Sequence, residues 1–411
     1  MSINRTSGSI IAFYFLLYAS FGFLAPYVAL FLERRGWSGT DIGIALFALT
    51  GAGFLGQFVF GFLADRTGRK RAIIAGLALG SGILCATWLT ATGAALFAAI
   101  VALGLFHRPL VPLMDSATFD HLGGEGRERY SFFRVGGSVG FLAASVIASV
   151  LVIPQFGLPG AFAAFAIAMI VAAPLTRAFG RPGSVSRPGQ SFTLTWISDR
   201  RIVATALMMF LLEFASTGIQ GYLGIYIDRY FDLPDNAIPI AWSIGLVAEL
   251  ALFFAAPFLL TRLSVRTVLL IGGGSAVLRY AILATGLATT SPTIFFASQL
   301  LHGVYYSIFF AAALGYLDSS SPAHLRASVL ATAHAFSTLA GLLLGYLVNG
   351  WLLDSLGLRA LFGISAGVAA VGVMILFTGL MPRIGTTLDR LGGDDALHDG
   401  DRTVPEFGSA S

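Results

Sequence analysis

Four side chains that can carry charge interrupt the long apolar stretches in the second half of this chain: Glu213, Glu249, Arg279 and His302. At 1.5 Å per residue, each would lie about 15–18 Å from a helix end, near the middle of a hydrocarbon layer about 30 Å thick. A charge at that depth is costly and generally has a partner or lines a cavity. We expect this group to load and release a proton, because burial disfavours a charged Glu249 while a nearby Arg279 favours it. Glu213 is a further candidate for the proton carrier, and the residues alone do not decide its role.

The first half holds a second polar group, with His107, Arg108 and Asp115 in one stretch and Arg134 at the start of the next. Arg108 and Asp115 are seven residues apart and would share one face of a helix. We expect an Asp115–Arg134 ion pair, and Arg108 or Arg134 could hold a substrate carboxylate through two hydrogen bonds. The alternative is that these charges form fixed pairs that keep helices in register, since the buried acids and arginines balance. His107 and His334 are expected to hydrogen-bond a neighbouring helix.

Aromatic side chains could line the same cavity as these charges. Tyr18, Tyr280 and Tyr305 lie deep in apolar stretches and are candidates for contact with substrate. Tyrosine faces together with an arginine would suit an aromatic carboxylate. Trp242 and Tyr226 lie near the ends of their stretches, where tryptophan and tyrosine commonly form belts at the membrane surface.

The elements that position these residues must be membrane helices. The chain has 411 residues, of which 56% are hydrophobic and 11% are charged, whereas a soluble protein has about 25% charged residues. This composition excludes a water-soluble enzyme, a nucleic-acid-binding protein and a disordered chain. It indicates a protein whose solvent is the lipid bilayer. The single cysteine, Cys85, allows no internal disulfide, and the first apolar run does not resemble a cleaved signal peptide.

Twelve apolar stretches are long enough to cross a membrane as helices. They are 9–32, 42–64, 72–91, 94–121, 134–153, 158–177, 202–227, 238–260, 267–288, 292–317, 327–350 and 357–380. The predicted fold class is an all-α membrane protein with twelve transmembrane helices in two pseudo-symmetric six-helix bundles. The bundles would span 1–177 and 202–380, joined by a polar cytoplasmic linker, 178–201. Residues 381–411 are expected to form a disordered cytoplasmic tail.

The basic residues predict the orientation of the chain. With the N-terminus inside, 18 of the 25 basic residues fall in inner segments, and only Arg34, Arg35, Arg229 and Arg359 fall in outer loops. We therefore expect a multi-pass protein of a bacterial inner membrane, with both termini in the cytoplasm. The two halves also look alike at an offset of 196 residues, where GFLADRTGRKR (61–71) matches PFLLTRLSVRT (257–267). A repeated six-helix unit is typical of many secondary transporters.

A spaced motif joins the second and third stretches, and it consists of Gly61, Asp65, Arg66, Gly68, Arg69 and Lys70. Gly61 would permit close approach of helices and Gly68 a tight turn. Asp65 could cap the next helix or pair with arginines across the bundle. We therefore expect this loop to act in conformational change. The alternative is that any cytoplasmic loop collects arginine.

This motif, the twelve stretches and the central linker resemble the major facilitator superfamily over residues 9–380. The resemblance implies two six-helix domains around a central cavity that opens alternately to either side. Five further segments are similar to the phenylpropionate permease branch and its relative lactose permease, an oligosaccharide:proton symporter-like group. They are PLVPLMDSA (109–117), RVGGSVGF (134–141), WSIGLVAEL (242–250), LRYAI (278–282) and LLHGVYYS (300–307).

The resemblance also implies roles for individual residues. Asp115 and Arg134 match an acid and its arginine partner, both of which contact sugar in lactose permease. Glu249, Arg279 and His302 match members of its proton-coupling and sugar-binding cluster.

The chain departs from that pattern at one position. Tyr305 stands three residues after His302, where lactose permease has its coupling carboxylate. Tyrosine is a poor proton carrier at neutral pH, so either Glu249 or Glu213 takes over or the mechanism differs. The departure also disfavours a galactoside as substrate.

We expect a proton-coupled symporter that imports a small organic solute by alternating access, with an aromatic carboxylate such as phenylpropionate as the favoured substrate. A sugar or nucleoside symporter is the alternative, followed by a drug–proton antiporter, which would be expected to have fewer paired charges in the C-terminal half. The expected partners are the solute, the proton and the bilayer, without nucleic acid, metal or cofactor, and the protein is expected to be a monomer. An enzyme is disfavoured because the sequence offers no metal-ligand cluster or Ser/His/Asp grouping, and an ATP-driven pump because it offers no phosphate-binding loop.

Overall fold

The computed structural model describes residues 5–123, 129–179, 195–231, 233–321 and 326–378. The regular elements in these ranges are all helical. Ten helical stretches among them are long and apolar enough to cross a membrane. Residues 180–194 of the expected linker and the whole expected tail, 381–411, lie outside the described residues.

Two of the ten stretches are too long for a single crossing. Tyr130–Ala178 has 49 residues and Ser328–Phe377 has 50, whereas about 20 helical residues span the hydrocarbon layer. Each bends at a glycine with positive φ, Gly157 (63°) and Gly357 (80°), a conformation that other residues rarely adopt. Each stretch is therefore two helices joined by a tight turn, and the prediction of twelve crossings is confirmed.

The first six crossings contain one short additional helix and one interrupted helix. Their elements are α1 (Arg5–Leu24), α2 (Val28–Glu33), α3 (Gly39–Thr67), α4 (Lys70–Thr87), α5 (Gly93–His107), α6 (Leu110–Leu122), α7 (Tyr130–Ile147) and α8 (Ile153–Ala172). The predicted stretch 94–121 is divided into α5 and α6 by a turn at Arg108 and Pro109, because proline cannot donate the backbone hydrogen bond that continues a helix.

The last six crossings include a strongly interrupted one. Their elements are α9 (Arg200–Tyr230), α10 (Ala237–Arg262), α11 (Val265–Ala284), α12 (Pro292–Ser298), α13 (Leu300–Gly303), α14 (Phe310–Ser320), α15 (Arg326–Ala335) and α16 (Gly341–Met374). A π-helical turn, Val304–Phe309, joins α13 to α14. Such turns are rare and often occur at functional sites.

A capping box begins α3 and a glycine ends it. Ser38 accepts a hydrogen bond from the Asp41 N–H, and the Asp41 carboxylate accepts one from the Ser38 N–H, which is a capping box. At the other end Gly68 adopts a left-handed conformation (φ 64°), the usual conformation for a residue that ends a helix. The helix therefore begins and ends in polar sequence, and its 29 residues carry it across the apolar layer.

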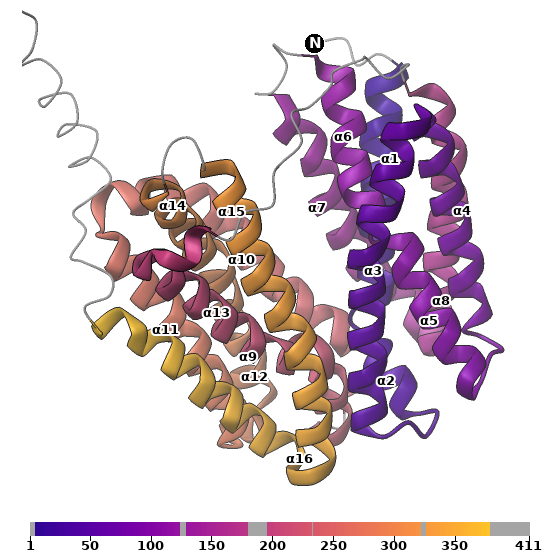
Figure 1. Cartoon of the computed structure of the whole chain (residues 1–411). Coiled ribbons are helices and arrows are strands. Elements are labelled where there is room, and N and C mark those ends of the chain that lie inside the picture. The colour runs from indigo at the N-terminus through magenta and orange to yellow at the C-terminus, as the bar shows by residue number, and fades with distance from the viewer. Residues whose placement is uncertain (1–4, 124–128, 180–194, 232, 322–325, 379–411) are drawn as a thin grey trace, which may run out of the picture.

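The two groups of helices, α1–α8 and α9–α16, lie side by side and meet at one end (Figure 1). They diverge toward the end where the N-terminus lies, and they meet at the opposite end, which we call the closed end. There α3 packs directly on α16, since a Cβ atom on Gly43 would lie 2.5 Å from the carbonyl oxygen of Tyr346. Only glycine permits such an approach.

Charged side chains also join the two groups at the closed end. Asp354 of α16 accepts hydrogen bonds from the backbone N–H groups of Gly39 and Thr40, both at 2.7 Å. The ion pairs are Arg34–Asp228 (2.5 Å), Arg34–Asp235 (2.7 Å) and Glu33–Arg229. The closed end is therefore held by polar contacts at the surface and by helix packing beneath them.

Candidate functional site

The charged residues of the C-terminal group form a continuous contact chain. His302 Nε2 lies 3.6 Å from Glu249 Oε2, and His302 Nδ1 lies 3.1 Å from Arg279 Nη1. Arg279 also donates to Gln299 Oε1 and is only 6% exposed. These residues come from α10, α11 and the crossing built of α12 and α13. The structure thus brings together the three residues that the sequence grouped as proton-coupling candidates.

Glu213 makes a separate contact within the same group of helices. Its side chain is 1% exposed, and the Tyr305 hydroxyl donates to its Oε2 at 3.5 Å. Tyr305 lies in the π-helical turn that follows α13. The tyrosine that stands where the resemblance places a carboxylate is therefore within hydrogen-bonding distance of a carboxylate from another helix.

The polar pair of the N-terminal group is surrounded by hydroxyl groups and rings. Arg134 Nε lies 3.8 Å from Asp115 Oδ1, so the expected contact is present. The Tyr14 hydroxyl donates to the same oxygen at 2.7 Å, and Thr118 donates to Tyr14 at 3.1 Å. The guanidinium group of Arg134 lies 4.4 Å from the ring centroid of Tyr18, a cation–π contact. An acid and a ring therefore both balance the charge of Arg134.

Arg108 is placed differently from Arg134. It lies at the turn between α5 and α6, and its side chain packs against Gly53 of α3. The seven-residue spacing from Asp115 produces no ion pair, because the turn interrupts the helix and Asp115 instead contacts Arg134. No carboxylate among the described residues pairs with Arg108.

A cavity of about 160 Å³ lies between the two groups of helices, and Arg108 lines it. From the opposite group come Gln220 of α9, Trp242 of α10 and Tyr346 of α16. The rest of the lining is mostly apolar and includes Phe21 of α1. The indole nitrogen of Trp242 is buried and has no hydrogen-bond acceptor among the described residues. Two donors without an acceptor, Arg108 and Trp242, therefore line one cavity.

A smaller cavity of about 20 Å³ lies within the C-terminal group. Gln220 and Trp242 line this cavity too, and so they border both. Gln220 donates to the Ser216 hydroxyl at 2.7 Å, which in turn donates to the backbone oxygen of Glu213 at 2.8 Å. The other polar members of its lining include Arg279, Tyr280, His302 and Tyr305. The smaller cavity thus shares two wall residues with the larger one and is itself lined by buried charged residues.

Three predictions about aromatic and histidine side chains are wrong. Trp242 lies between two cavities rather than in a surface belt, because the contact between the helix groups covers the start of α10. Tyr226 is fully buried and donates to the backbone oxygen of Leu283 at 3.1 Å. His334 contacts Thr338, one turn further along the same crossing, rather than a neighbouring helix.

The predicted hydrogen bond of His107 to a neighbouring helix is confirmed, because its Nε2 lies 2.8 Å from the hydroxyl of Ser20 on α1. Gln220 is a candidate that the sequence analysis missed. It follows Glu213 by seven residues, two turns along the same helix, and an amide inside an apolar stretch was the available signal.

The loop motif lies at the end of α3 that points away from the closed end. Lys70 pairs with Asp120 at 2.5 Å and donates to the Ser116 hydroxyl, and Gly68 makes the expected turn. The expected roles of Gly61 and Asp65 are not present in this conformation. A Cβ on Gly61 would meet open space, and Asp65 is exposed, without an ion pair among the described residues. Arg66 lies over the ring of Phe62, and Arg69 is exposed.

The described residues contain no group of three or more histidine, cysteine, aspartate or glutamate side chains suited to a metal ion. Two donors in one cavity can bind an oxyanion, and the buried acids can hold or release a proton.

Comparison with known proteins places these observations among transporters. The model of the MFS_1 like family matches residues 8–364. The chain is 28% identical over 370 residues to a protein of Escherichia coli (strain K12) named "Probable 3-phenylpropionic acid transporter", which covers 85% of this chain and 94% of that protein. It is 24% identical over 373 residues to the maltose permease of Geobacillus stearothermophilus, and the match covers 89% of this chain and 92% of that protein.

Solved structures show the same architecture. The crystal structure of the nucleoside transporter NupG superposes with a TM-score of 0.80 and covers 91% of this chain and all of that chain. The two sequences are 16% identical, so the likeness shows a shared fold.

Proposed function

The chain belongs to the MFS_1 like family and has the major facilitator fold, and on this basis we propose that it imports a small aromatic carboxylate together with a proton. It is a membrane transporter of small molecules rather than an enzyme. The observation that carries the proposal is a pair of donors, Arg108 and Trp242 Nε1, that line the cavity between the two groups of helices, where Trp242 Nε1 has no acceptor and Arg108 no ion-pair partner among the described residues.

The donors support an anionic substrate. The side chain of Arg108 is half-buried, and a guanidinium group that is partly removed from water without an acid is unfavourable unless something compensates its charge. A carboxylate can accept two hydrogen bonds from Arg108 and a further one from the indole N–H of Trp242. The name of the Escherichia coli relative, a 3-phenylpropionic acid transporter, agrees with this substrate class.

The size and lining of the cavity support an aromatic ring beside the carboxylate. The cavity has about 160 Å³, which is below the range of about 300–1,000 Å³ usual for small-molecule sites. Phe21, Trp242 and Tyr346 line it and can contact a ring by stacking or edge-to-face packing. These features favour a compact aromatic acid over a disaccharide such as maltose.

The distribution of buried charge supports coupling to a proton. Arg134 is paired with Asp115, and Arg279 lies beside His302, which contacts Glu249. Glu213 has no cationic partner among the described residues.

Binding a carboxylate at Arg108 therefore adds a negative charge to a balanced set, and one proton restores the balance. A proton on Glu213 breaks no ion pair, whereas a proton on Asp115 or Glu249 weakens a contact with Arg134 or His302. We therefore assign the coupled proton to Glu213, with Glu249 as the alternative carrier.

We also propose that the protein lies in a bacterial inner membrane as a monomer, with both termini in the cytoplasm. The basic residues concentrate on the side of the N-terminus, so the closed end would face outward. Cysteines placed at Thr67 and at Thr90 test the orientation, because Cys85 is buried and free. An impermeant thiol reagent added to intact cells should label position 90 and leave position 67 unlabelled.

Uptake by proteoliposomes tests the function directly. We expect radiolabelled 3-phenylpropionate to accumulate under an inward proton gradient, and a protonophore to abolish the accumulation. Maltose and uridine serve as comparison solutes at the same concentration. Accumulation of either one without the aromatic acid would overturn the substrate class, and uptake of the acid that ignores the proton gradient would overturn the coupling.

A further inference from the structure

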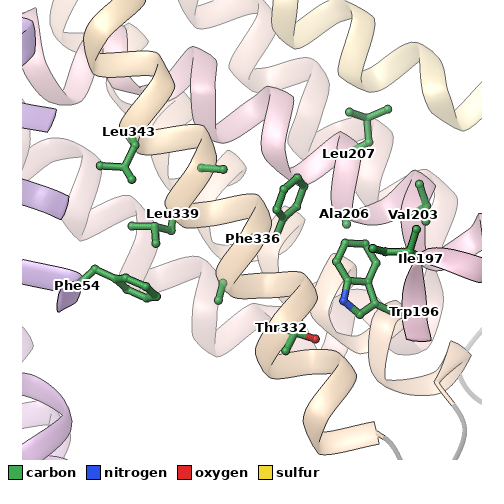
Figure 2. Close-up of a pocket in the computed structure, with 12 residues that line it drawn as sticks. Phe54, Trp196, Ile197, Val203, Ala206, Leu207, Thr332, Phe336, Leu339 and Leu343 are labelled. Carbon is green, nitrogen blue, oxygen red and sulfur yellow. The ribbon is translucent and has the colours of Figure 1, made fainter. Parts of the chain in front are cut away.

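An apolar groove of about 630 Å³ lies outside the proposed transport site. Figure 2 shows it between Phe54 of α3, the start of α9 with the turn before it, and the crossing that runs from α15 into α16. Thr332 is the only lining residue with a polar aliphatic side chain, and its hydroxyl already donates to the backbone oxygen of Ser328. The groove shares no lining residue with the two cavities described above.

One polar atom in the groove wall, the indole nitrogen of Trp196, has no partner in the part of the chain that the structure describes. The side chain of Trp196 is 6% exposed, and its indole nitrogen is buried without an acceptor among the described residues. The centroid of its ring lies 5.9 Å from that of Phe336, another residue of the groove wall, and Figure 2 shows the nitrogen on the side toward Thr332. A buried donor is expected to be hydrogen-bonded, so a ligand of this groove should offer an oxygen acceptor beside Trp196.

The surface next to Trp196 is basic. Arg200 and Arg201 begin α9 directly after the turn that carries Trp196, and both are exposed. Asp199 accepts a hydrogen bond from the backbone N–H of Arg201 at 2.8 Å and so caps the helix. The groove therefore has a long apolar wall with one buried donor, Trp196, and two exposed cationic side chains follow that donor in the sequence by four and five residues.

We propose that this groove binds one acyl chain of an anionic phospholipid. An ester oxygen of the glycerol backbone accepts the hydrogen bond of Trp196, and the phosphate lies beside Arg200 and Arg201. The membrane supplies such a ligand at high concentration, and Ile197, Leu207 and Phe336 at the groove are each more than 40% exposed, so its mouth is open to lipid.

The bound acyl chain would also favour one conformation of the protein. Phe54 belongs to the N-terminal group of helices, and the rest of the wall belongs to the C-terminal group. A ligand held between the groups favours the conformation in which they stand apart at this position. The lipid is therefore expected to stabilise the arrangement seen here, with the opposite end closed.

Native mass spectrometry of the purified full-length protein tests the site, with phosphatidylglycerol and phosphatidylcholine of identical chains as probes. We expect one tightly bound phosphatidylglycerol per protein and weaker retention of phosphatidylcholine. Trp196→Phe keeps the ring and removes the donor, so it should weaken phosphatidylglycerol binding by about 2–10-fold, as for the loss of one hydrogen bond. The double substitution Arg200→Gln with Arg201→Gln should remove the preference between the two lipids.

A larger side chain in the groove provides the steric test. Ala335→Trp should occupy the groove and abolish the tightly bound lipid, whereas Ile167→Trp, on a surface of α8 that is 62% exposed, should not. Retention of one tightly bound phosphatidylglycerol in Ala335→Trp would overturn the proposal. So would equal binding of the two lipids to the wild type, or a wild type that binds neither because residues of its own chain fill the groove. The Trp196→Phe measurement decides the matter if Ala335→Trp does not fold.

Discussion

Arg108 and Arg134 show how two residues of one type acquire different tasks from their surroundings. The sequence offered both as partners for a substrate carboxylate. In the structure Arg134 is balanced by Asp115 and by the ring of Tyr18, whereas Arg108 lines a cavity without an acid. We therefore propose that Arg108 is the residue that binds the anion and that Arg134 holds helices together.

Substitution of Arg108 should weaken binding of the substrate. Arg108→Gln removes charge-assisted hydrogen bonds worth about 1.5–3 kcal/mol, or roughly 10–100-fold in affinity. The affinity of purified protein for 3-phenylpropionate can be measured by calorimetry. Arg262→Gln is a suitable control, because Arg262 ends α10 and lies over the ring of Phe258. Unchanged affinity in Arg108→Gln would remove this residue from the binding site.

Substitution of Glu213 should separate transport from proton movement. Glu213→Gln cannot exchange a proton, so we expect it to lose accumulation of substrate under a proton gradient while it still exchanges labelled for unlabelled substrate. Glu249→Gln is the companion variant, since the Glu249 carboxylate contacts His302. If Glu249→Gln alone loses accumulation, then Glu249 carries the proton and our assignment to Glu213 is wrong.

The sequence could predict which charged residues lie together, but not which one lacks a partner. Glu249, Arg279 and His302 stand out because each is ionisable and lies in an apolar stretch at a similar depth. Ionisable side chains inside a membrane commonly pair with one another. The solitary position of Arg108 depends on the turn at Pro109 and on packing against Gly53. Those features follow from three-dimensional contacts that a single sequence does not reveal.

At the scale of the elements, glycine decides how closely helices approach. The closed end depends on α3 and α16, which approach so closely at Gly43 that a Cβ atom would lie 2.5 Å from a backbone oxygen. The sequence predicted the helices themselves, because their apolar stretches are long. It did not predict this contact or the π-helical turn at Tyr305, since neither leaves a periodic pattern.

Gly43→Ala should loosen the closed end. The added methyl group must displace α16, so we expect the distribution of distances between spin labels at Thr90 and Ser355 to shift to longer values. Gly51→Ala is a matched control on the same helix, because its Cβ would make an ordinary contact of 3.7 Å with Leu343. A distribution that is equal in both variants and the wild type would show that this approach does not hold the closed end together.

At the scale of the whole molecule, ion pairs at the closed end link the two groups of helices, and they differ in how well they compensate the charges of their members. Hydrogen bonding to Asp235 is the main cause that raises the pKa of Arg34, so these contacts favour its charged form. Burial raises the pKa of the Glu33 carboxyl, although Arg229 acts in the opposite direction. The Glu33–Arg229 pair therefore does not fully compensate the burial of Glu33.

This imbalance predicts how the closed end responds to pH. Because the pKa of Glu33 is higher in the closed arrangement than its ordinary value, the closed arrangement binds the proton more tightly, and acidification favours it. We expect the distances between spin labels at Thr90 and Ser355 to shift to shorter values as the pH falls toward the raised pKa of Glu33. This extra stabilisation of the closed arrangement should disappear as the pH rises through that pKa. Glu33→Gln should remain closed without this dependence. A closed end that opens on acidification would contradict the sign of the effect.

The Glu33–Arg229 pair has a consequence for the origin of the two halves. The two residues are 196 positions apart, which is the offset at which the halves of the sequence match, so equivalent positions of the two repeats meet each other. In an assembly of two identical repeats around a two-fold axis, a residue on the axis would meet its own copy. Glutamate would then face glutamate, or arginine would face arginine, and either pair repels. The attraction between Glu33 and Arg229 is therefore available only after the two repeats have diverged in sequence.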